Sequence, residues 1–312
     1  MLHRRDDAGQ RTFGVNVQLE ANTQDGDQID ESYLYVSEPS LGRLILGDEN
    51  NAGYLLHVTA PDGGVSLDSG DLVSIDAFYI PVVGTFDTAI ATTYLRFFDN
   101  DSGKITYITP RFAGFQLGGS YIPNFEGGGD DNSSLRACGR CNGFYDGWAG
   151  GGNYTADFGG FGLQLSAGAM TAKANAGPDT DNLFAWSLGG QGSIGGFTAG
   201  FGFARGEQGR GGTGGGSIIQ INSTGWTVGG TYEVGPYKVG VTYQRGEGNP
   251  NTSTAIDTSG KQHLDQAVLS GTYTLGPGVR LVGGVFWFDG ESEGNTTKND
   301  GYGFATGFKL GF

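Results

Sequence analysis

The sequence contains no long apolar run, although it has 312 residues and 37% of them are hydrophobic. A transmembrane helix needs about 20 consecutive, mostly apolar residues, and no segment supplies them. Proline is scarce, with nine residues, and the glycines follow no triplet repeat, which excludes a collagen-like chain. Only three histidines are present, so acid–base catalysis has few candidates. Helical periodicity is also missing, which leaves strands as the expected elements.

Basic residues are few. The chain has 18 Lys and Arg against 33 Asp and Glu, which gives a net charge of −15. This balance argues against a nucleic-acid partner, because phosphates are bound by Lys and Arg. The first residues, MLHRRDDAGQR, contain no apolar stretch of the kind that a secretory signal requires. An exported protein needs that signal, so we expect that it stood before the given start.

Glycine and aromatic residues are abundant. There are 61 glycines, nearly a fifth of the chain, together with 20 Phe and 14 Tyr. Glycine-rich chains are often disordered, but disordered chains are poor in aromatics. This composition therefore argues against a disordered chain.

Apolar and polar residues alternate in runs of about ten. In 224–234, Trp226, Val228 and Tyr232 alternate with Thr227 and Thr231. Successive runs are joined alternately by tight glycine turns and by longer polar segments. Outer-membrane barrels have this arrangement, with short turns at one end of the barrel and longer loops at the other. A soluble sandwich also shows this period, but here the rings gather near strand ends, as at the two membrane interfaces. The pattern predicts a transmembrane, antiparallel, up-and-down β-barrel in a lipid bilayer.

The alternation gives about 14 strands. The segment 279–288 is ambiguous, because Val285-Phe286-Trp287-Phe288 is apolar on both faces. The expected strands are 12–21, 29–37, 42–47, 104–109, 114–123, 147–157, 161–171, 182–193, 197–205, 223–234, 237–246, 264–275, 279–288 and 300–312.

The last strand places Phe308, Leu310 and Phe312 on one face, and the chain stops at Phe312. A soluble protein rarely leaves such an edge strand uncovered, because it invites aggregation. This ending resembles the signal by which outer-membrane barrels are recognised for assembly.

Two stretches resemble the trimeric general porins of Gram-negative bacteria, and their alphaproteobacterial branch in particular. They are DESYLYVSEPSLGRLILGDENNAG (30–53) and KITYITPRFAGFQLGGSYIP (104–123). The resemblance implies that residues 1–312 form one barrel domain of the 16-stranded porin type, with about 14 of the strands present in this chain. It places the barrel in the outer membrane, as a homotrimer assembled with the help of the barrel assembly machinery. It also implies passive diffusion of small hydrophilic solutes and ions.

The strand count is two below the family's 16. It predicts a chain that lacks the first two strands of the family as well as the signal peptide. A self-closing barrel of 14 strands, in which 12–21 pairs with 300–312, is the alternative.

On the family's pattern, the segment 48–103 is the long loop that folds into the lumen and narrows it. Its carboxylates would face bases on the wall and produce a transverse field, and an acidic lumen predicts a weak preference for cations. Oxygen-rich loops also suit calcium, which some relatives bind, although no regular calcium spacing is present and no cofactor is otherwise expected. The acids are Asp48, Glu49, Asp62, Asp68, Asp71, Asp76 and Asp87, and the wall bases are Arg43, Lys104 and Lys238.

Two further motifs give little information about function. Cys138 and Cys141 lie in the polar segment 124–146, and we interpret them as a disulfide that closes an exposed loop, as an exported protein permits. A zinc site needs four ligands, and no histidine lies nearby in the sequence. The glycine tract 210–216 is not followed by Gly-Lys-Ser/Thr, so it is not a phosphate-binding loop.

Three alternatives stay open beside a general diffusion channel. A channel specific for one solute would show saturable block by that solute. A secreted glycine-rich β adhesin would show repeats of fixed length and would need no detergent. A barrel enzyme is disfavoured, because no nucleophile motif accompanies the few histidines.

Overall fold

A computed structural model describes residues 2–5, 11–19, 29–65, 93, 102–125, 144–174, 182–207, 221–249, 261–292 and 298–311. Fifteen described strands form one antiparallel sheet in sequence order, so each strand pairs with the next along the chain. The strands are β1 (Leu2–Arg5), β2 (Thr12–Leu19), β3 (Ile29–Glu38), β4 (Gly42–Asp48), β5 (Gly103–Ile108), β6 (Phe115–Asn124), β7 (Phe144–Asp157), β8 (Phe161–Ala174), β9 (Leu183–Ile194), β10 (Phe197–Glu207), β11 (Ile221–Val234), β12 (Tyr237–Asn249), β13 (Gln262–Gly276), β14 (Val279–Ser292) and β15 (Lys298–Leu310). One short helix, α1 (Ala52–Leu55), follows β4. This topology confirms the predicted up-and-down β-barrel architecture.

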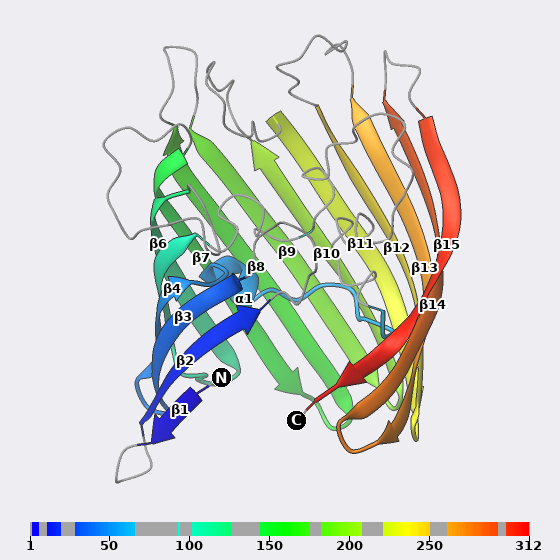
Figure 1. The fold of residues 1–312 in the computed structure, drawn as a ribbon, viewed down its shortest axis with the longest axis horizontal. Helices are drawn as coiled ribbons and strands as arrows, with labels where there is room; N and C mark the ends of the chain where they lie inside the picture. Colours follow the sequence, from blue (N-terminus) through cyan, green and yellow to red (C-terminus); the bar gives the residue numbers. More distant parts are fainter. Residues whose placement is uncertain are drawn as a thin grey trace.

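The sheet curls around an interior, and α1 with the chain that follows it lies inside the curve (Figure 1). Short turns join alternate pairs of strands at one end, which we call the turn end; the other is the loop end. At the turn between β11 and β12, Gly235 has φ +56, a left-handed conformation that lets the chain reverse within two residues. No described helix is long and apolar enough to cross a membrane.

The first strands differ from the expectation in one respect. A strand at Leu2–Arg5 pairs with β2, so β2 lies between β1 and β3. The alternative in which 12–21 pairs with 300–312 is therefore wrong for this structure. The strand β1 has four residues, too few for an alternating pattern to reveal it in the sequence.

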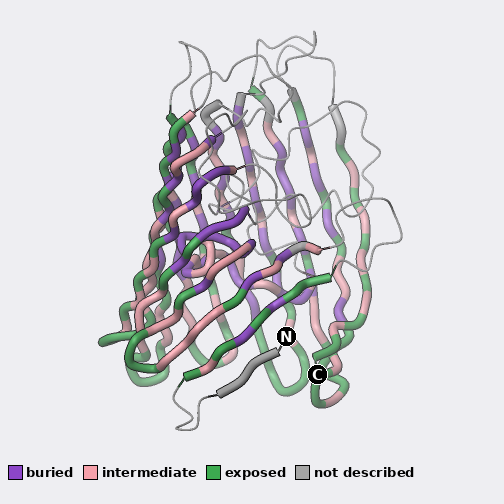
Figure 2. Tube along the Cα trace, turned by 60° about the vertical axis from the view of Figure 1, so that its left-hand side comes forward, coloured by how far each residue is buried: buried purple, intermediate pink, exposed green. Residues whose placement is uncertain are grey.

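The two faces of the sheet are inverted relative to a soluble protein. Outward positions are apolar and exposed, such as Phe304 at 77% on β15 and Leu117 at 58% on β6. Inward positions carry buried polar groups, among them Thr227, Gln244 and Gln266. The alternation of buried and exposed positions is visible along the strands in Figure 2. Lipid contact accounts for an apolar outer face combined with a polar interior.

Aromatic rings lie in two belts on the outer face. All four tryptophans stand near the loop end of their strands, at Trp148, Trp186, Trp226 and Trp287. Three of them are paired with a ring on a neighbouring strand, at centroid distances of 4.8, 5.0 and 5.4 Å. Near the turn end, Phe115–Tyr154, Phe197–Tyr232 and Tyr237–Tyr273 form a second set of ring pairs. Rings at these two levels match the two membrane interfaces.

The ambiguous run in β14 is resolved by its neighbour β15. Val285 and Trp287 are exposed on the outer face, whereas Phe286 and Phe288 are each 6% exposed on the inner face. The inner rings cover Gly303 and Gly301 of β15, where an added Cβ would lie 2.5 and 3.0 Å from the respective ring carbons. The inner rings therefore occupy the room that those glycines leave.

Candidate functional site

The segment from Asn51 to Gly64, which we call the inward segment, lies against the inner face of the sheet. Its start is fixed by α1, where the Asn51 side chain accepts a hydrogen bond from the Tyr54 amide at 3.1 Å. The Ala52 amide donates to Ser120 Oγ on β6 at 2.8 Å. Asn153 of β7 then donates to the Leu56 carbonyl oxygen at 3.1 Å. The segment therefore leaves β4 and attaches first to β6 and β7.

Beyond α1 the inward segment continues across the wall. The Val58 amide donates to Ser166 Oγ on β8 at 2.8 Å. Gln191 of β9 donates to the Thr59 carbonyl oxygen at 2.7 Å. On β13, Thr272 Oγ1 donates to the carbonyl oxygen of Gly63 at 3.0 Å. Neutral wall side chains thus satisfy the backbone of the segment, as buried peptide groups require.

Glycines of the wall lie under this path, and we call Gly118, Gly151, Gly189, Gly200 and Gly240 the glycine track. A Cβ at Gly189 would overlap the carbonyl oxygen of Val58. One at Gly200 would lie 3.0 Å from the Thr59 oxygen, and one at Gly240 would lie 2.9 Å from the Cα of Gly63. The track lets the segment approach the wall at backbone distance, which is one physical use of the high glycine content.

The first cluster of charged groups surrounds the start of the inward segment. Lys104 of β5 is fully buried and donates to the Glu49 carbonyl oxygen. Glu49 itself is 5% exposed and accepts from the Asn50 amide at 2.9 Å. The Asn50 side chain donates to Glu31 of β3 at 2.8 Å. This near-wall cluster, consisting of Glu31, Glu49, Asn50 and Lys104, anchors the segment.

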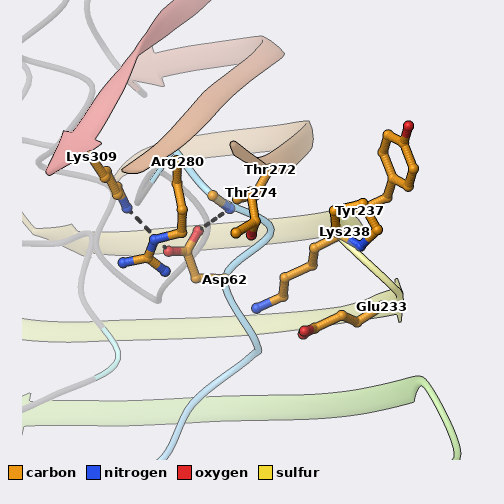
Figure 3. A pocket seen from close by; sticks show the side chains of 10 residues that line it. Asp62, Glu233, Tyr237, Lys238, Thr272, Thr274, Arg280 and Lys309 are labelled. Atoms are coloured by element: carbon orange, nitrogen blue, oxygen red, sulfur yellow. Dashed lines mark hydrogen bonds and ion pairs between the residues drawn. The ribbon is translucent and has the colours of Figure 1, made fainter. Parts of the chain in front are cut away.

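The second cluster lies where the segment reaches the far side, near the turn end. Asp62 faces Lys238 of β12, Arg280 of β14 and Lys309 of β15, and Glu233 of β11 lies beside Lys238 (Figure 3). An Asp62 carboxylate oxygen is 3.6 Å from Lys309 Nζ, and the other accepts from the Gly64 amide at 2.7 Å. We call Asp62, Glu233, Lys238, Arg280 and Lys309 the far-wall cluster. It lines a cavity of about 130 Å³.

The expected site residues are thus divided between two places. Asp48, which is 9% exposed at the end of β4, accepts a hydrogen bond from Ser32 at 3.3 Å. The Arg43 guanidinium stacks over the Tyr35 ring at 4.3 Å. Lys104 differs from its expected position on the pore surface, because its buried amine holds the backbone of Glu49. Asp62 and Lys238 come together in the far-wall cluster.

Several expected residues lie outside the described part of the chain. They are Asp68, Asp71, Asp76, Asp87, Cys138, Cys141 and Phe312. Phe308 and Leu310 are described and stand on the outer face, 65% and 59% exposed. Within the described residues no group of three or more His, Cys, Asp and Glu side chains could hold a metal.

The expectation did not include Arg280 and Lys309. They are register partners on β14 and β15, and Lys238 has Thr272 of β13 as its partner. A sequence signal for them does exist: all three bases fall on the polar face of an alternating strand, close to its turn end. Alternation places the three basic side chains on the inner face of the sheet, and their distance from the tight turns places them at the same height along the barrel.

His57 lies in the inward segment between Leu56 and Val58, which are hydrogen-bonded to β7 and β8. Burial lowers its pKa from 6.5 to about 4, and a backbone hydrogen bond at Thr93 opposes this shift. The imidazole is therefore neutral at pH 7.

A curled sheet with an apolar exterior, a polar interior and a chain segment seated inside defines the class of transmembrane β-barrel channels. A family model described as Gram-negative porin matches residues 6–293. The chain therefore belongs to the Gram-negative porin family, and it is an integral outer-membrane β-barrel. Comparison with curated protein sequences gave no match.

Solved structures share this fold at low sequence identity. The anion-selective porin from Comamonas acidovorans is 17% identical, with a TM-score of 0.55, over 98% of this chain and 85% of that one. A mutant of the Rh. blastica porin is 14% identical, with a TM-score of 0.54 and coverages of 99% and 87%. The trimer form of OmpT, an outer membrane protein of Vibrio cholerae, is 13% identical, with a TM-score of 0.55 and coverages of 97% and 87%.

Proposed function

We propose that this protein is a passive diffusion channel for small hydrophilic solutes and ions across the outer membrane, without enzymatic activity. The observation that carries the proposal is the inward segment, whose backbone is hydrogen-bonded to the inner wall at Ser120, Ser166 and Thr272. A segment held inside a barrel narrows the water path and sets the size of the solutes that pass. In this proposal residues 1–312 form one domain, and the whole of 48–103 belongs to the narrowing loop.

The charge of the chain supports a weak preference for cations. The net charge is −15, and the loop 48–103 carries the acids Asp48, Glu49, Asp62, Asp68, Asp71, Asp76 and Asp87. Carboxylates around a water-filled path raise the local concentration of cations. Of the solved structures above, the Comamonas porin is described as anion-selective, so the sign of the preference has to be measured on this chain.

The test is conductance across a planar lipid bilayer under a gradient of potassium chloride. We expect discrete channels and a small reversal potential of the sign that cation preference gives. A reversal potential of the opposite sign would reject the cation preference but would still support a diffusion channel. Bilayers without current, together with a chain that stays dispersed without detergent, would reject the channel and favour a secreted β adhesin.

Assembly is part of the proposal. We propose a homotrimer, supported by the OmpT structure, which is described as a trimer form. The outward row that includes Phe308 and Leu310, and that ends at Phe312, would be recognised by the barrel assembly machinery. Cross-linking of the detergent-extracted protein would show trimers, and deletion of Phe312 would lower the amount inserted in the membrane.

Two minor elements of the proposal concern the loops. A disulfide between Cys138 and Cys141 would make the mass of the unreduced, alkylated protein lower than that of the reduced and alkylated protein. Conduction would need no cofactor, and calcium binding to acidic loops stays a prediction, which calorimetric titration with calcium would test.

A solute-specific channel is the second candidate. The far-wall cluster favours it, because three bases converge on one cavity.

A further inference from the structure

We infer that the far-wall cluster is a binding subsite for the phosphate group of a small solute at the turn-end mouth of the channel. This inference rests on the proposed channel function and adds a class of solute to it. The far-wall cluster unites residues from four strands and from the inward segment, and Figure 3 shows their side chains converging on one space.

The geometry supplies several donors for one anion. Arg280 and Lys309 are directly opposite each other on β14 and β15. Lys238 has Thr272 as its partner, and Thr274 is the partner of Arg280. Three cations and two hydroxyls therefore line one cavity of about 130 Å³. A phosphate group offers three or more acceptor oxygens, and Arg and Lys bind it through charge-assisted hydrogen bonds.

The charge balance of the cavity is positive. Lys238, Arg280 and Lys309 stand against Asp62 and Glu233, which leaves one net positive charge. The pair between Asp62 and Lys309 is long, at 3.6 Å, and both side chains are about one third exposed, at 33% and 37%. Partly exposed pairs of this kind contribute little, so an incoming phosphate group can replace the carboxylate at Lys309.

The inward segment fixes where Asp62 stands. The Gly63 carbonyl oxygen accepts from Thr272, and Gly64 has φ +151, a conformation that favours glycine. The Gly64 amide holds the other oxygen of Asp62 at 2.7 Å. Asp62 is thus held where it competes with the anion for Lys309. This competition weakens anion binding, as a channel requires, because a solute must leave the site again.

The experiment measures potassium chloride current through single channels while potassium phosphate is added to either side. We expect a saturable block that is stronger from the turn-end side. The double variant Lys238→Gln/Arg280→Gln should weaken the block about tenfold, because it removes two charge-assisted bonds. Asp62→Asn should strengthen it about threefold, since it removes the competing carboxylate.

Lys173→Gln is the matched control for charge. Lys173 pairs with Asp146 at 2.5 Å on the outer face, near the loop end, so this change leaves the cavity untouched. Glucose 6-phosphate compared with glucose separates a phosphorylated solute from the sugar alone, and inorganic phosphate gives the free-anion arm. An unblocked wild-type current, or equal weakening by Lys173→Gln, would overturn the inference.

Calorimetric titration of the detergent-refolded protein with phosphate separates the two levels of the proposal. Phosphate binding combined with electrically silent bilayers would reject the channel and keep the subsite. Channels that conduct, but neither bind phosphate nor are blocked by it, would reject the subsite and keep the channel.

Discussion

The side-chain amine of Lys104 on β5 donates a hydrogen bond to the carbonyl oxygen of Glu49, 55 positions earlier in the chain. Lys104 is fully buried, so this ammonium serves the backbone at the point where the chain leaves β4. The contact ties the start of the inward segment to the wall.

Replacing Lys104 by methionine should therefore destabilise the protein. The buried carbonyl group of Glu49 would lose its donor, at a cost of about 1–3 kcal/mol. Denaturant-induced unfolding of the refolded barrel measures this cost. Lys173→Met is the control, because Lys173 is an exposed residue and surface changes stay within about 0.5 kcal/mol. Equal losses in the two variants would contradict the anchoring role of Lys104.

The glycine track leads to a second prediction, on pore width. Gly189→Ala places a methyl group where the Val58 carbonyl oxygen lies, so the inward segment must move away from the wall. We expect a lower single-channel conductance, because the displaced chain stands closer to the pore axis. Gly307→Ala is the matched control, since the space around Gly307 is open within 4 Å. A conductance that Gly189→Ala leaves at the wild-type value would refute the seating by backbone contact.

His57 predicts a dependence on pH. Its pKa is lowered to about 4 in the seated segment, against 6.5 for a solvated histidine. Between pH 6.5 and pH 4, His57 is protonated when the segment is released from the wall but stays neutral when the segment is seated. Seating is therefore most stable above pH 6.5 and weakens as the pH falls towards 4. The loss over this window is up to about 3 kcal/mol.

Current fluctuations recorded between pH 7 and pH 4 measure this effect. They should grow as the pH falls in the wild type and grow less in His57→Gln. The difference between the two proteins removes the contribution of carboxylates that titrate in the same range. Identical pH profiles would show that His57 has no part in the seating.

The tryptophan belt predicts an asymmetric depth in the membrane. All four tryptophans lie on the outer face near the loop end of β7, β9, β11 and β14. Lipids brominated close to the headgroup should quench their fluorescence more than lipids brominated near the chain ends, because the interface holds these rings. Stronger quenching from the centre of the bilayer would contradict the placement of the belt.

The strand pattern was predictable from the sequence because lipid on one side and water on the other force a period of two. Trp226 and Thr227 already show it, and β11 follows it in the structure. Strand ends were harder, since β7 begins at Phe144 rather than 147: a register shift between Tyr145 and Trp148 breaks the alternation. Such irregularities leave no signal in a period-two count.

The charged site was only half predictable. Alternation shows that Lys104 and Lys238 face inward, but it does not show what the inward segment covers. Lys104 is buried because Glu49 lies over it, and this contact is set by the path of the segment rather than by the strand. The same path brings Asp62 to Lys309, near the opposite end of the sequence. Long-range contacts of this kind need the three-dimensional course of the chain.

The glycine track also has a consequence for how the width of the pore can change. At Gly189, Gly200 and Gly240 the wall presents only backbone atoms to the inward segment. Adding one methyl group at one of these positions is the smallest change that moves the segment away from the wall. These positions point away from the lipid, and a change in them leaves the hydrophobic coat as it was. We therefore expect that the solute size limit of the proposed channel can be altered in small increments, independently of the surface that holds the barrel in its membrane.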